Sequence, residues 1–330
     1  MRHGNVSLET AKGLQFLRER IAAAKIPSSK LDETINIATW NVRDFGKSPR
    51  QEASIHYIAE IINQFDLVAL TELKDNLGDL KRVMHLLGDY WSVIYCDYID
   101  DHGGNKERMA YLFDKRAVVF TGLAAELDPA RIETSNGDWL SDINWHRSPY
   151  MASFSAGSFD FVMIMAHIRF DLVSDRIRPL QLLADWIYDR RNSAYAVDKD
   201  MILLGDFNIT TRRSKTYKAI TSKGLKMPKS LGKRSIKTNL AKNKIYDQIL
   251  HYPTHEDRFT ERAGSIDFYD NDEESIEKYF PGQGLSKEKF TRQISDHLPL
   301  WAQINVDLEE DELSQLLTQR VPVLEFPDRV

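Results

Sequence analysis

The chain has 330 residues, which corresponds to one large domain or two small ones. Hydrophobic residues make up 42% and charged residues 28% of the sequence, a composition that supports a buried core and excludes a disordered chain. The net charge of −5 argues against a protein that coats nucleic acid through its overall charge, and the single cysteine, Cys96, excludes an intramolecular disulfide and a cysteine-ligated metal cluster.

The chain begins with a segment that we interpret as a helical extension, residues 1–33. Apolar residues recur at helical spacing from Leu8 to Ala24, which predicts one amphipathic helix. The segment lacks the apolar core of a secretory signal, and no stretch of the chain approaches the roughly 18 apolar residues of a membrane span. We therefore expect a cytoplasmic protein that does not associate with a membrane.

Residues 34–306 form one continuous pattern without a linker rich in Pro, Gly or Ser, which predicts a single domain followed by a tail, residues 307–330. Helical periodicity predicts helices over 54–63, 77–87 and 175–191. Apolar or alternating runs predict strands over 34–40, 66–70, 91–96, 109–113, 117–120, 150–154, 159–166, 201–204, 245–251 and 300–304. Many strands with a few interleaved helices indicate an α/β or α+β sandwich, with helices outside the sheets.

Polar side chains lie next to several of these strands, mostly just after the strand ends. In chain order they are Asn41, Glu72, His167, Asp206, Asn208, Asp296 and His297. Because strand ends converge at the rim of a sheet, these side chains can share one cleft. Carboxylate and amide oxygens without cysteine favour Mg²⁺, with Mn²⁺ or Ca²⁺ as alternatives, and such an ion would relieve the repulsion between the carboxylates.

The two histidines of this set, His167 and His297, titrate near neutrality and can give or take a proton. Together with carboxylates and a hard metal ion, they predict hydrolysis of phosphodiesters or phosphomonoesters. Each residue alone also has a structural explanation, since residues 205–208 fit an ordinary turn after a strand and a lone histidine is often a hydrogen-bonded core residue. The functional interpretation depends on all of them occurring together.

A basic block interrupts this acidic chain. From Arg212 to Tyr246 the sequence holds twelve lysines and arginines and no acidic residue. Such a block indicates a local surface that faces anions. A mobile, solvated loop is the alternative that charge alone leaves open.

Four motifs resemble those of the endonuclease/exonuclease/phosphatase superfamily. They are Thr39-Trp40-Asn41-Val42-Arg43, Leu70-Thr71-Glu72, Leu204-Gly205-Asp206-Phe207-Asn208 and Ser295-Asp296-His297-Leu298-Pro299-Leu300. Within the superfamily the chain is most similar to the deoxyribonuclease I branch, which also has counterparts of Arg147-Ser148-Pro149, Ala166-His167 and Ile245-Tyr246-Asp247-Gln248-Ile249. The match keeps the family's motif order over residues 35–305.

The resemblance implies a four-layered α/β sandwich, with two mainly antiparallel sheets packed face to face and helices outside. It also implies Mg²⁺-dependent cleavage of phosphate esters, which leaves 5′-phosphate and 3′-hydroxyl ends when the substrate is nucleic acid. Carried onto this sequence, Glu72 is the main metal ligand, with Asn41 beside it and Asp296 near the ion.

The resemblance further implies roles for six catalytic residues. Asp206 orients or deprotonates the attacking water, and Asn208 hydrogen-bonds the phosphate. His297, oriented by Asp247, and His167, oriented by Glu107, are the two catalytic imidazoles, of which His167 serves the leaving oxygen. The cations that we expect to contact the nucleic-acid backbone are Arg43, Arg108, Arg147, Arg212, Arg213 and Lys215.

Two departures from the family pattern are informative. Thr71 stands where most relatives have glutamine, so a hydroxyl replaces an amide next to Glu72. Deoxyribonuclease I is secreted and disulfide-bonded, whereas this chain has only Cys96, which favours an intracellular enzyme.

The sequence thus predicts a metal-dependent endonuclease that acts on DNA with little sequence preference. The same site would serve a phosphodiesterase or phosphatase of lipid head groups or small phosphorylated metabolites. A repair enzyme for abasic DNA is a further alternative. Leu73-Lys74 resembles the motif of that branch, whereas Tyr246-Asp247-Gln248 does not. A catalytically inactive binding module is disfavoured because no expected acid or histidine is missing.

Overall fold

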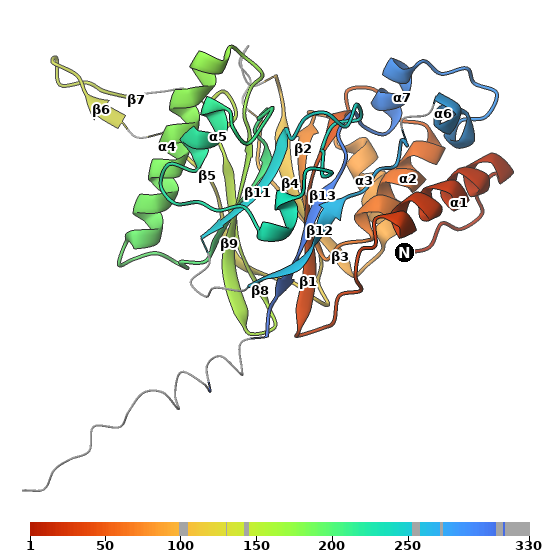
Figure 1. Cartoon of the computed structure of the whole chain (residues 1–330), viewed down its shortest axis with the longest axis horizontal. Helices are drawn as coiled ribbons and strands as arrows, with labels where there is room; N and C mark the ends of the chain where they lie inside the picture. The colour runs from red at the N-terminus through yellow and green to blue at the C-terminus, as the bar shows by residue number, and fades with distance from the viewer. Residues whose placement is uncertain are drawn as a thin grey trace, which may run out of the picture.

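The computed structural model describes residues 1–98, 105–129, 131–141, 145–252, 258–270, 273–307 and 313. Two β-sheets pack face to face, and helices cover the outer face of each sheet (Figure 1). This four-layered arrangement confirms the predicted α/β sandwich. The predicted tail, residues 307–330, lies outside the described residues except for Asp307 and Leu313.

The first sheet has six strands in the order β12-β13-β1-β2-β4-β3. These strands are β1 (Thr34–Phe45), β2 (Leu67–Leu73), β3 (Trp91–Tyr95), β4 (Arg108–Asp114), β12 (Phe259–Ser265) and β13 (Leu300–Asn305). The second sheet has the order β11-β10-β9-β8-β5. Its strands are β5 (Val119–Glu126), β8 (Tyr150–Ala156), β9 (Phe159–His167), β10 (Met201–Asp206) and β11 (Asp247–Tyr252).

Both sheets are mainly antiparallel, and among the described strands only β1 with β2 and β9 with β10 pair in parallel. Each parallel pair brings two carboxyl-terminal strand ends to one rim. A separate hairpin of β6 (Arg131–Glu133) and β7 (Trp139–Ser141) projects away from the second sheet (Figure 1).

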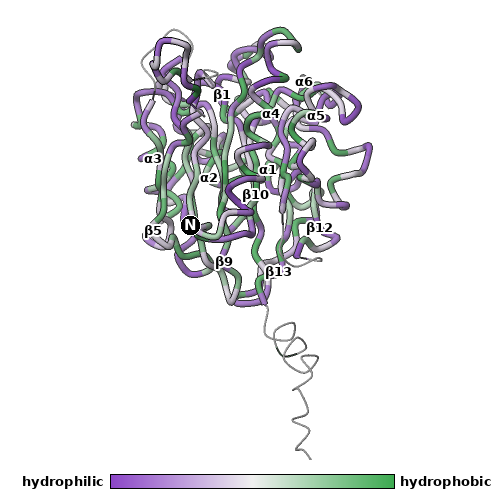
Figure 2. The backbone as a smooth tube through the Cα atoms, turned by 90° about the vertical axis from the view of Figure 1, so that its left-hand side faces the viewer, coloured by the Kyte–Doolittle hydropathy of each residue, from purple (hydrophilic) through white to green (hydrophobic). Residues whose placement is uncertain are grey.

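The alternation of side chains along β1 shows how the strands separate two cores. Ile35 and Ile37 point into the core between the sheets, whereas Ala38 and Trp40 point into the core under the first helical layer. Hydrophobic residues accordingly concentrate along the strands, and the loops at the strand ends are mostly hydrophilic (Figure 2). A buried strand of this kind leaves a polar residue at its end little freedom to move.

Helices cover the two sheets unequally. The first sheet is covered by α1 (Leu8–Ala23), α2 (Glu52–Ile62), α3 (Gly78–Leu87), α6 (Glu273–Tyr279) and α7 (Lys287–Gln293). The second sheet is covered by α4 (Val173–Asn192) and α5 (Lys215–Ile220) (Figure 1).

The predicted N-terminal helix is confirmed as α1, and it packs on α2 and α6 within the same hydrophobic core as the first sheet. Gly13 lies where α1 meets α2, and a Cβ at this position would come 2.0 Å from Tyr57 Oη. Tyr57 Oη donates to the carbonyl of Tyr279 (2.9 Å), which ties α2 to the end of α6. The glycine therefore permits a close contact between helices.

Most predicted elements are confirmed to within a few residues, but several elements were not predicted. The strand predicted over 117–120 is β5, which runs on to Glu126. The elements without a prediction are β6, β7, β12, α5, α6, α7 and a 3₁₀ turn, η1 (Lys229–Gly232). They are short or polar, so they lack the apolar periodicity on which a sequence prediction rests.

Cys96 lies just after β3 and is 7% exposed. Its sulfur accepts a hydrogen bond from the Met109 backbone N–H (3.2 Å). Burial raises the pKa of the Cys96 thiol to about 12. Within the described part of the chain, every helix is too short or too polar to span a membrane.

Candidate active site

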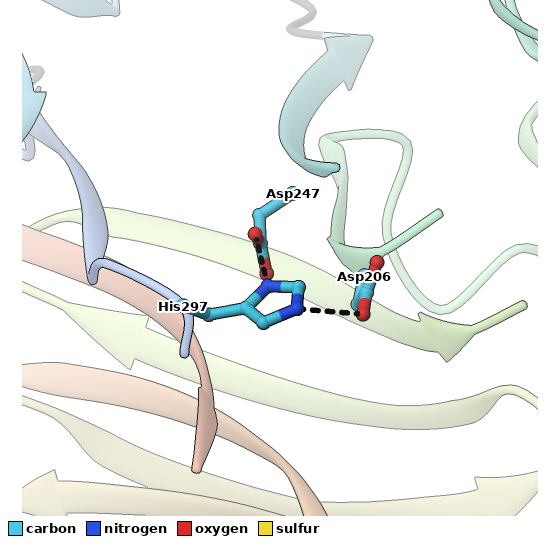
Figure 3. Close-up of side chains that lie close together, drawn as sticks. All are labelled: Asp206, Asp247 and His297. Carbon is cyan, nitrogen blue, oxygen red and sulfur yellow. Dashed lines mark hydrogen bonds and ion pairs between the residues drawn. The ribbon is translucent and has the colours of Figure 1, made fainter. Parts of the chain in front are cut away.

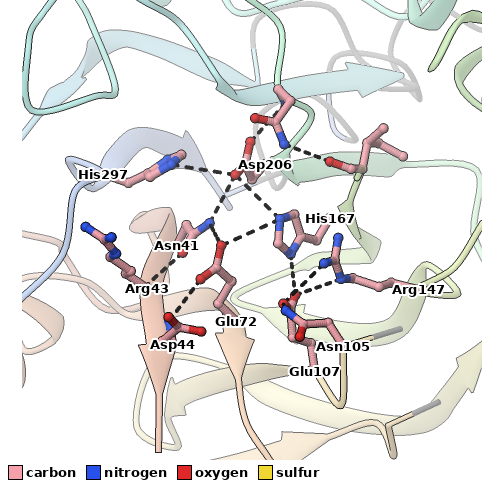
Figure 4. Close-up of polar contacts among 12 residues, drawn as sticks. Asn41, Arg43, Asp44, Glu72, Asn105, Glu107, Arg147, His167, Asp206 and His297 are labelled. Carbon is pink, nitrogen blue, oxygen red and sulfur yellow. Dashed lines mark hydrogen bonds and ion pairs between the residues drawn. The ribbon is translucent and has the colours of Figure 1, made fainter. Parts of the chain in front are cut away.

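The polar residues singled out in the sequence meet at one rim of the sandwich, where both sheets contribute strand ends (Figure 4). Asn41 on β1 is in register with Thr71 on β2, next to Glu72. Asp206 at the end of β10 is in register with His167 on β9 on one side and Asp247 on β11 on the other. The parallel pairs therefore place the ends of four strands beside one another.

Gly205 allows Asp206 to reach this position. Its φ is +135°, and a Cβ at this residue would lie 2.0 Å from the carbonyl oxygen of Ala166 on β9. Any larger residue would push β10 away from β9 just before the rim that carries Asp206. The close approach of β9 and β10 thus explains why the Gly205–Asn208 motif begins with glycine.

Asn41 bridges the two sheets through its side-chain amide. Its Nδ2 donates to Glu72 Oε1 (2.8 Å) and to Asp206 Oδ2 (3.0 Å). Its Oδ1 accepts from the Arg43 backbone N–H (2.9 Å), and Glu72 Oε2 accepts from the Asp44 N–H (2.9 Å). Glu72, Arg43 and Asp44 have positive φ angles, so this corner of the backbone is held in a conformation that side-chain-bearing residues rarely adopt.

His297 and Asp247 form the first of two carboxylate–imidazole pairs (Figure 3). His297 Nδ1 lies 2.8 Å from Asp247 Oδ2, and its Nε2 lies 3.7 Å from Asp206 Oδ2. Ser295 supports the loop, because its hydroxyl donates to the Asn41 carbonyl and accepts from the His297 N–H. The imidazole is thereby fixed with Nε2 directed toward Asp206.

His167 and Glu107 form the second pair, on the other side of Asp206 (Figure 4). His167 Nδ1 lies 2.9 Å from Glu107 Oε2, and its Nε2 lies 3.7 Å from Asp206 Oδ2. Glu107 is also bound by Lys74 Nζ (2.9 Å) and Arg147 Nε (2.7 Å). Asp206 is therefore flanked by two imidazoles at the same distance, each oriented by its own carboxylate.

The electrostatics of the site follow from this burial and pairing. Burial alone would raise the pKa of Asp206, but His297 and His167 lower it below its ordinary value. Burial alone would lower the pKa of His297, but Asp247 and Asp206 raise it well above its ordinary value. Burial would likewise raise the pKa of Glu107, but His167, Arg147 and Lys74 hold it well below its ordinary value.

Asp296 lies at the solvent-facing side of the site. Its carboxylate is 3.6 Å from the Arg43 guanidinium and is partly exposed. It lines a groove of about 400 Å³ together with Arg43, Tyr246, Thr291 and His297. The groove leads to the His297 imidazole and gives a substrate access to it.

Asn208 occupies a turn with a φ of +52°. Its backbone N–H donates to Asp206 Oδ1 (2.9 Å), and its Nδ2 donates to the Ile168 carbonyl (2.8 Å). The amide nitrogen carries two hydrogens, so one remains for a ligand.

The predicted nucleic-acid contacts divide into two groups. Arg108 binds Asp97, and Arg147 binds Glu107. Arg212 donates to the carbonyls of Gly232 and Leu231, and Arg43 contacts Thr291 and Asp296. Arg213 and Lys215 are exposed on the loop before and at the start of α5.

The side chains present fit a hard divalent ion. Asp206, Asp247 and His297 are buried, and their ligand atoms lie within 4.8 Å of one another. Asp247 Oδ2 already binds His297 Nδ1, and Asp206 Oδ2 already accepts from Asn41, whereas Asp247 Oδ1 has no hydrogen-bond partner among the described residues. Glu72 and Asp206 share the Asn41 amide, so a cation beside them would offset the repulsion of the two carboxylates. Asn41 Oδ1 retains a second lone pair beyond the Arg43 contact.

Sequence reasoning missed three supporting residues: Lys74, Asp44 and Asn105. Lys74 Nζ binds both Asp44 Oδ1 (3.2 Å) and Glu107 Oε1 (2.9 Å), and Asn105 Nδ2 donates to Glu107 Oε1 (2.6 Å). Lys74 stands two residues after Glu72 in the sequence, which is the one signal that pointed to it. Asp44 and Asn105 carry no such signal, because their contacts depend on an irregular part of β1 and on the loop before β4.

Two facing sheets place carboxylates and two carboxylate-paired imidazoles at one rim. One group of these residues could hold a divalent metal ion, and this combination is typical of a phosphoesterase. The profile of the Endonuclease/Exonuclease/phosphatase family matches residues 38–297, and the chain therefore belongs to this family. The chain has no match among curated proteins.

Solved structures of low sequence identity share the fold. A family protein from Bacteroides thetaiotaomicron is 17% identical with a TM-score of 0.55, over 84% of this chain and 96% of that chain. The mannosyl-6-phosphatase of the same species is 17% identical with a TM-score of 0.52, over 81% and 98%. D. rerio TDP2, complexed with a single-strand DNA product, is 15% identical with a TM-score of 0.53, over 82% and 99%.

Proposed function

We propose that this phosphoesterase is a metal-dependent endonuclease that hydrolyses DNA with little sequence preference, leaving 5′-phosphate and 3′-hydroxyl ends. The observation that carries the proposal is the position of Asp206, whose Oδ2 lies 3.7 Å from Nε2 of both His167 and His297. A phosphodiester placed against these three groups would meet a proton acceptor and an imidazole on each side. This is the arrangement that attack by water and protonation of a leaving oxygen require.

The side chains then have distinct tasks. Asp206 orients the attacking water and accepts its proton, and the free N–H of Asn208 donates to a phosphate oxygen as negative charge develops. His297 stabilises the phosphate from the Asp247 side, and His167 serves the leaving oxygen from the Glu107 side. A divalent ion held by Glu72 and Asp296, with Asn41 beside it, would act as a Lewis acid on the phosphate.

The basic block supports nucleic acid as the substrate, because it starts and ends at the site. It lies between Asp206 at the end of β10 and Asp247 at the start of β11. Its last part packs on the loop of His297, since the Leu240 N–H donates to the Asp296 carbonyl (2.9 Å) and the Leu298 N–H donates to the Thr238 carbonyl (2.7 Å). Its exposed cations are Arg213, Lys215, Lys218, Lys223, Lys226, Lys229, Lys233 and Arg234. Contacts of this kind bind phosphate without reading sequence.

The proposal is tested by incubating the purified chain with supercoiled plasmid and with single-stranded DNA in Mg²⁺, in Mn²⁺ and in EDTA. We expect cleavage with either metal, no cleavage in EDTA, and products that DNA ligase rejoins, since ligase requires a 5′-phosphate and a 3′-hydroxyl. Intact DNA in the presence of a folded, metal-supplied enzyme would contradict the proposal. Products that ligase does not rejoin would contradict the assigned end chemistry.

A small phosphate ester is the second candidate, and two observations favour it. Arg43, Arg108, Arg147 and Arg212 are engaged with groups of the protein, so fewer cations face the site than the sequence predicted. The groove of about 400 Å³ beside His297 would hold a compact substrate. Hydrolysis of sugar phosphates or sphingomyelin in the same buffers, with DNA left intact, would favour this candidate.

A further inference from the structure

A second cavity lies on the open edge of the sandwich, away from the catalytic rim. It has a volume of about 440 Å³ and is lined by the far end of β11 and the start of β12. These are the edge strands of the two sheets. His251 lies four residues beyond Asp247 on β11, which corresponds to roughly 13 Å along the strand. The cavity is therefore separate from the side chains assigned to hydrolysis.

The segment 224–230 closes this cavity and is fixed to both edge strands. The backbone of Lys226 pairs with that of His251 through two hydrogen bonds (3.2 and 2.8 Å). Ser230 Oγ donates to the Thr260 carbonyl on β12 (3.4 Å). At Gly224, a Cβ would lie 3.1 Å from Tyr252 Oη, so the glycine leaves space beside this hydroxyl. The cavity is built into the fold at its edge.

Positive charge dominates the lining. Among the described residues, four cations line the cavity, namely Arg191, Lys226, Lys229 and Arg258, against one acidic residue, Glu261. Arg258 is 2% exposed and lies over the Phe159 ring, and Arg191 lies over the Tyr252 ring. Two of the cations are held in place by aromatic rings, and Lys226 and Lys229 are exposed at the opening. A surface with this excess of positive charge attracts anions.

His251 Nδ1 and Tyr252 Oη are buried polar atoms of the lining without a hydrogen-bond partner among the described residues, and Arg191 Nε is another. Buried polar atoms are normally hydrogen-bonded, so such atoms in one cavity indicate a ligand. Burial and the nearby Lys226 lower the pKa of His251 to about 4, so this ring is neutral at pH 7. It would contribute a hydrogen bond to a ligand without adding charge.

We propose that this cavity binds a phosphate monoester of nucleotide size. Lys226, Lys229 and Arg191 would hold the phosphate, and Met227 and Phe259 would contact the organic part. The volume falls in the range of sites for small organic ligands, and the mixture of cations and apolar side chains suits an organic phosphate better than a bare anion. The proposal goes beyond hydrolysis at Asp206 and does not depend on it.

The experiment is isothermal titration calorimetry of the full chain in EDTA with adenosine monophosphate, inorganic phosphate or adenosine. We expect adenosine monophosphate to bind more tightly than inorganic phosphate and adenosine to bind most weakly. The double variant Lys226→Glu/Lys229→Glu should weaken binding of adenosine monophosphate at least tenfold. Tyr252→Phe, which removes one oxygen atom, should weaken it several-fold.

Two matched variants test whether binding belongs to this cavity. Lys218→Glu/Lys233→Glu makes the same charge change at exposed positions of the basic block outside the cavity and should leave binding unchanged. His297→Ala alters the catalytic rim and should also leave it unchanged. Thermal melts establish that each variant is folded. Absence of binding, equal loss in both charge variants, loss in His297→Ala, or phosphate binding as tightly as the nucleotide would each overturn the proposal.

Discussion

Lys74 joins the two halves of the catalytic rim. Its ammonium contacts Glu107, which holds His167, and Asp44, whose backbone N–H holds Glu72. The side chains of Lys74 and Glu107 are 6% and 3% exposed, so water cannot replace the ammonium at Glu107, whereas Asp44 is partly exposed. Glu107 would keep Arg147 and His167 as partners without this lysine but would lose one of its buried counter-charges.

We therefore expect Lys74→Met to lower kcat by about 10- to 100-fold and to destabilise the fold by about 3 kcal/mol, with partial rescue by Lys74→Arg. Steady-state kinetics and chemical unfolding measure the two effects. Lys81→Met, at an exposed position of α3, is the control for loss of a lysine and should change neither quantity. A Lys74→Met enzyme with normal kcat would exclude the positioning role.

Asp206 and His297 give the second prediction at this scale. Asp206→Asn keeps the shape of the side chain but removes the proton acceptor, and His297→Ala removes one imidazole. Each should reduce phosphoester hydrolysis by at least about 100-fold, with circular dichroism unchanged. Asp175→Asn, an exposed change on α4, should retain full activity. Wild-type-like turnover of either variant would contradict the assigned roles.

The proximity of most site residues could be predicted from the sequence, because most of them lie next to a buried strand and within a motif that resembles the family's. The residues that orient them could be predicted only in part. Asp247 lies in a recognisable strand, whereas Asp44 lies in an irregular part of β1 and Asn105 in the loop before β4, both with positive φ angles. Such conformations depend on tertiary contacts and have no local sequence pattern.

Helix α1 was predicted from periodicity, but its role in the core was not. Gly13 counts against a helix by propensity, yet the structure uses it for the contact with Tyr57. The short elements α6, α7 and β12 were missed because their apolar faces become evident only when they pack on α1, the first sheet and its edge.

The contact at Gly13 leads to a prediction on stability. Gly13→Ala gains up to about 1 kcal/mol of helix propensity. The added methyl would lie 2.0 Å from Tyr57 Oη, and overpacking costs about 1–3 kcal/mol, so the steric cost should win. We expect a lower free energy of unfolding by about 1–2 kcal/mol in urea titrations. Lys12→Ala, exposed on the same helix, should be neutral or stabilising, and a stabilised Gly13→Ala would contradict the packing.

Glu60 on α2 anchors the N-terminal segment. Its carboxylate accepts from Arg18 Nε on α1 (2.6 Å) and lies 2.7 Å from His3 Nε2. Burial alone would raise the pKa of Glu60, but His3 and Arg18 lower it to about 2. Because the folded pKa lies below the unfolded value of 4.5, this stabilisation is fully present above pH 4.5 and is lost as the pH falls toward 2.

We expect Glu60→Gln to cost about 1–2 kcal/mol at pH 7, a modest value because Arg18 is largely exposed. The difference between variant and wild type should shrink between pH 4.5 and pH 2. Unfolding titrations across this pH range measure the difference, with Glu19→Gln at an exposed position of α1 as the control. A difference that is constant with pH would show that the ion pairs contribute nothing to it.

The whole molecule combines a net charge of −5 with a basic block on one side of the catalytic rim. If the block binds the DNA backbone, Arg213→Gln/Lys215→Gln/Lys218→Gln should weaken DNA cleavage at 150 mM salt. It should also reduce the salt slope of DNA binding by about 2–3, since each neutralised phosphate contact contributes about 0.9. Fluorescence anisotropy at several salt concentrations measures the slope.

The matched triple variant is Lys12→Gln/Lys25→Gln/Lys81→Gln, which removes three exposed cations from the helical layer of the first sheet. It should leave the slope unchanged. Equal slopes for wild type and the basic-block variant would assign the block to another ligand and favour the small phosphate ester as substrate.

Cys96 makes this chain convenient for spectroscopy. Its thiol is enclosed and remains protonated at neutral pH, so maleimide reagents should leave the native protein unmodified. A cysteine introduced at an exposed position outside the cavity lining, for example at Lys233 directly after η1, would then be the single labelling point in the folded enzyme. Dyes attached there would report on ligand binding without replacement of the native Cys96.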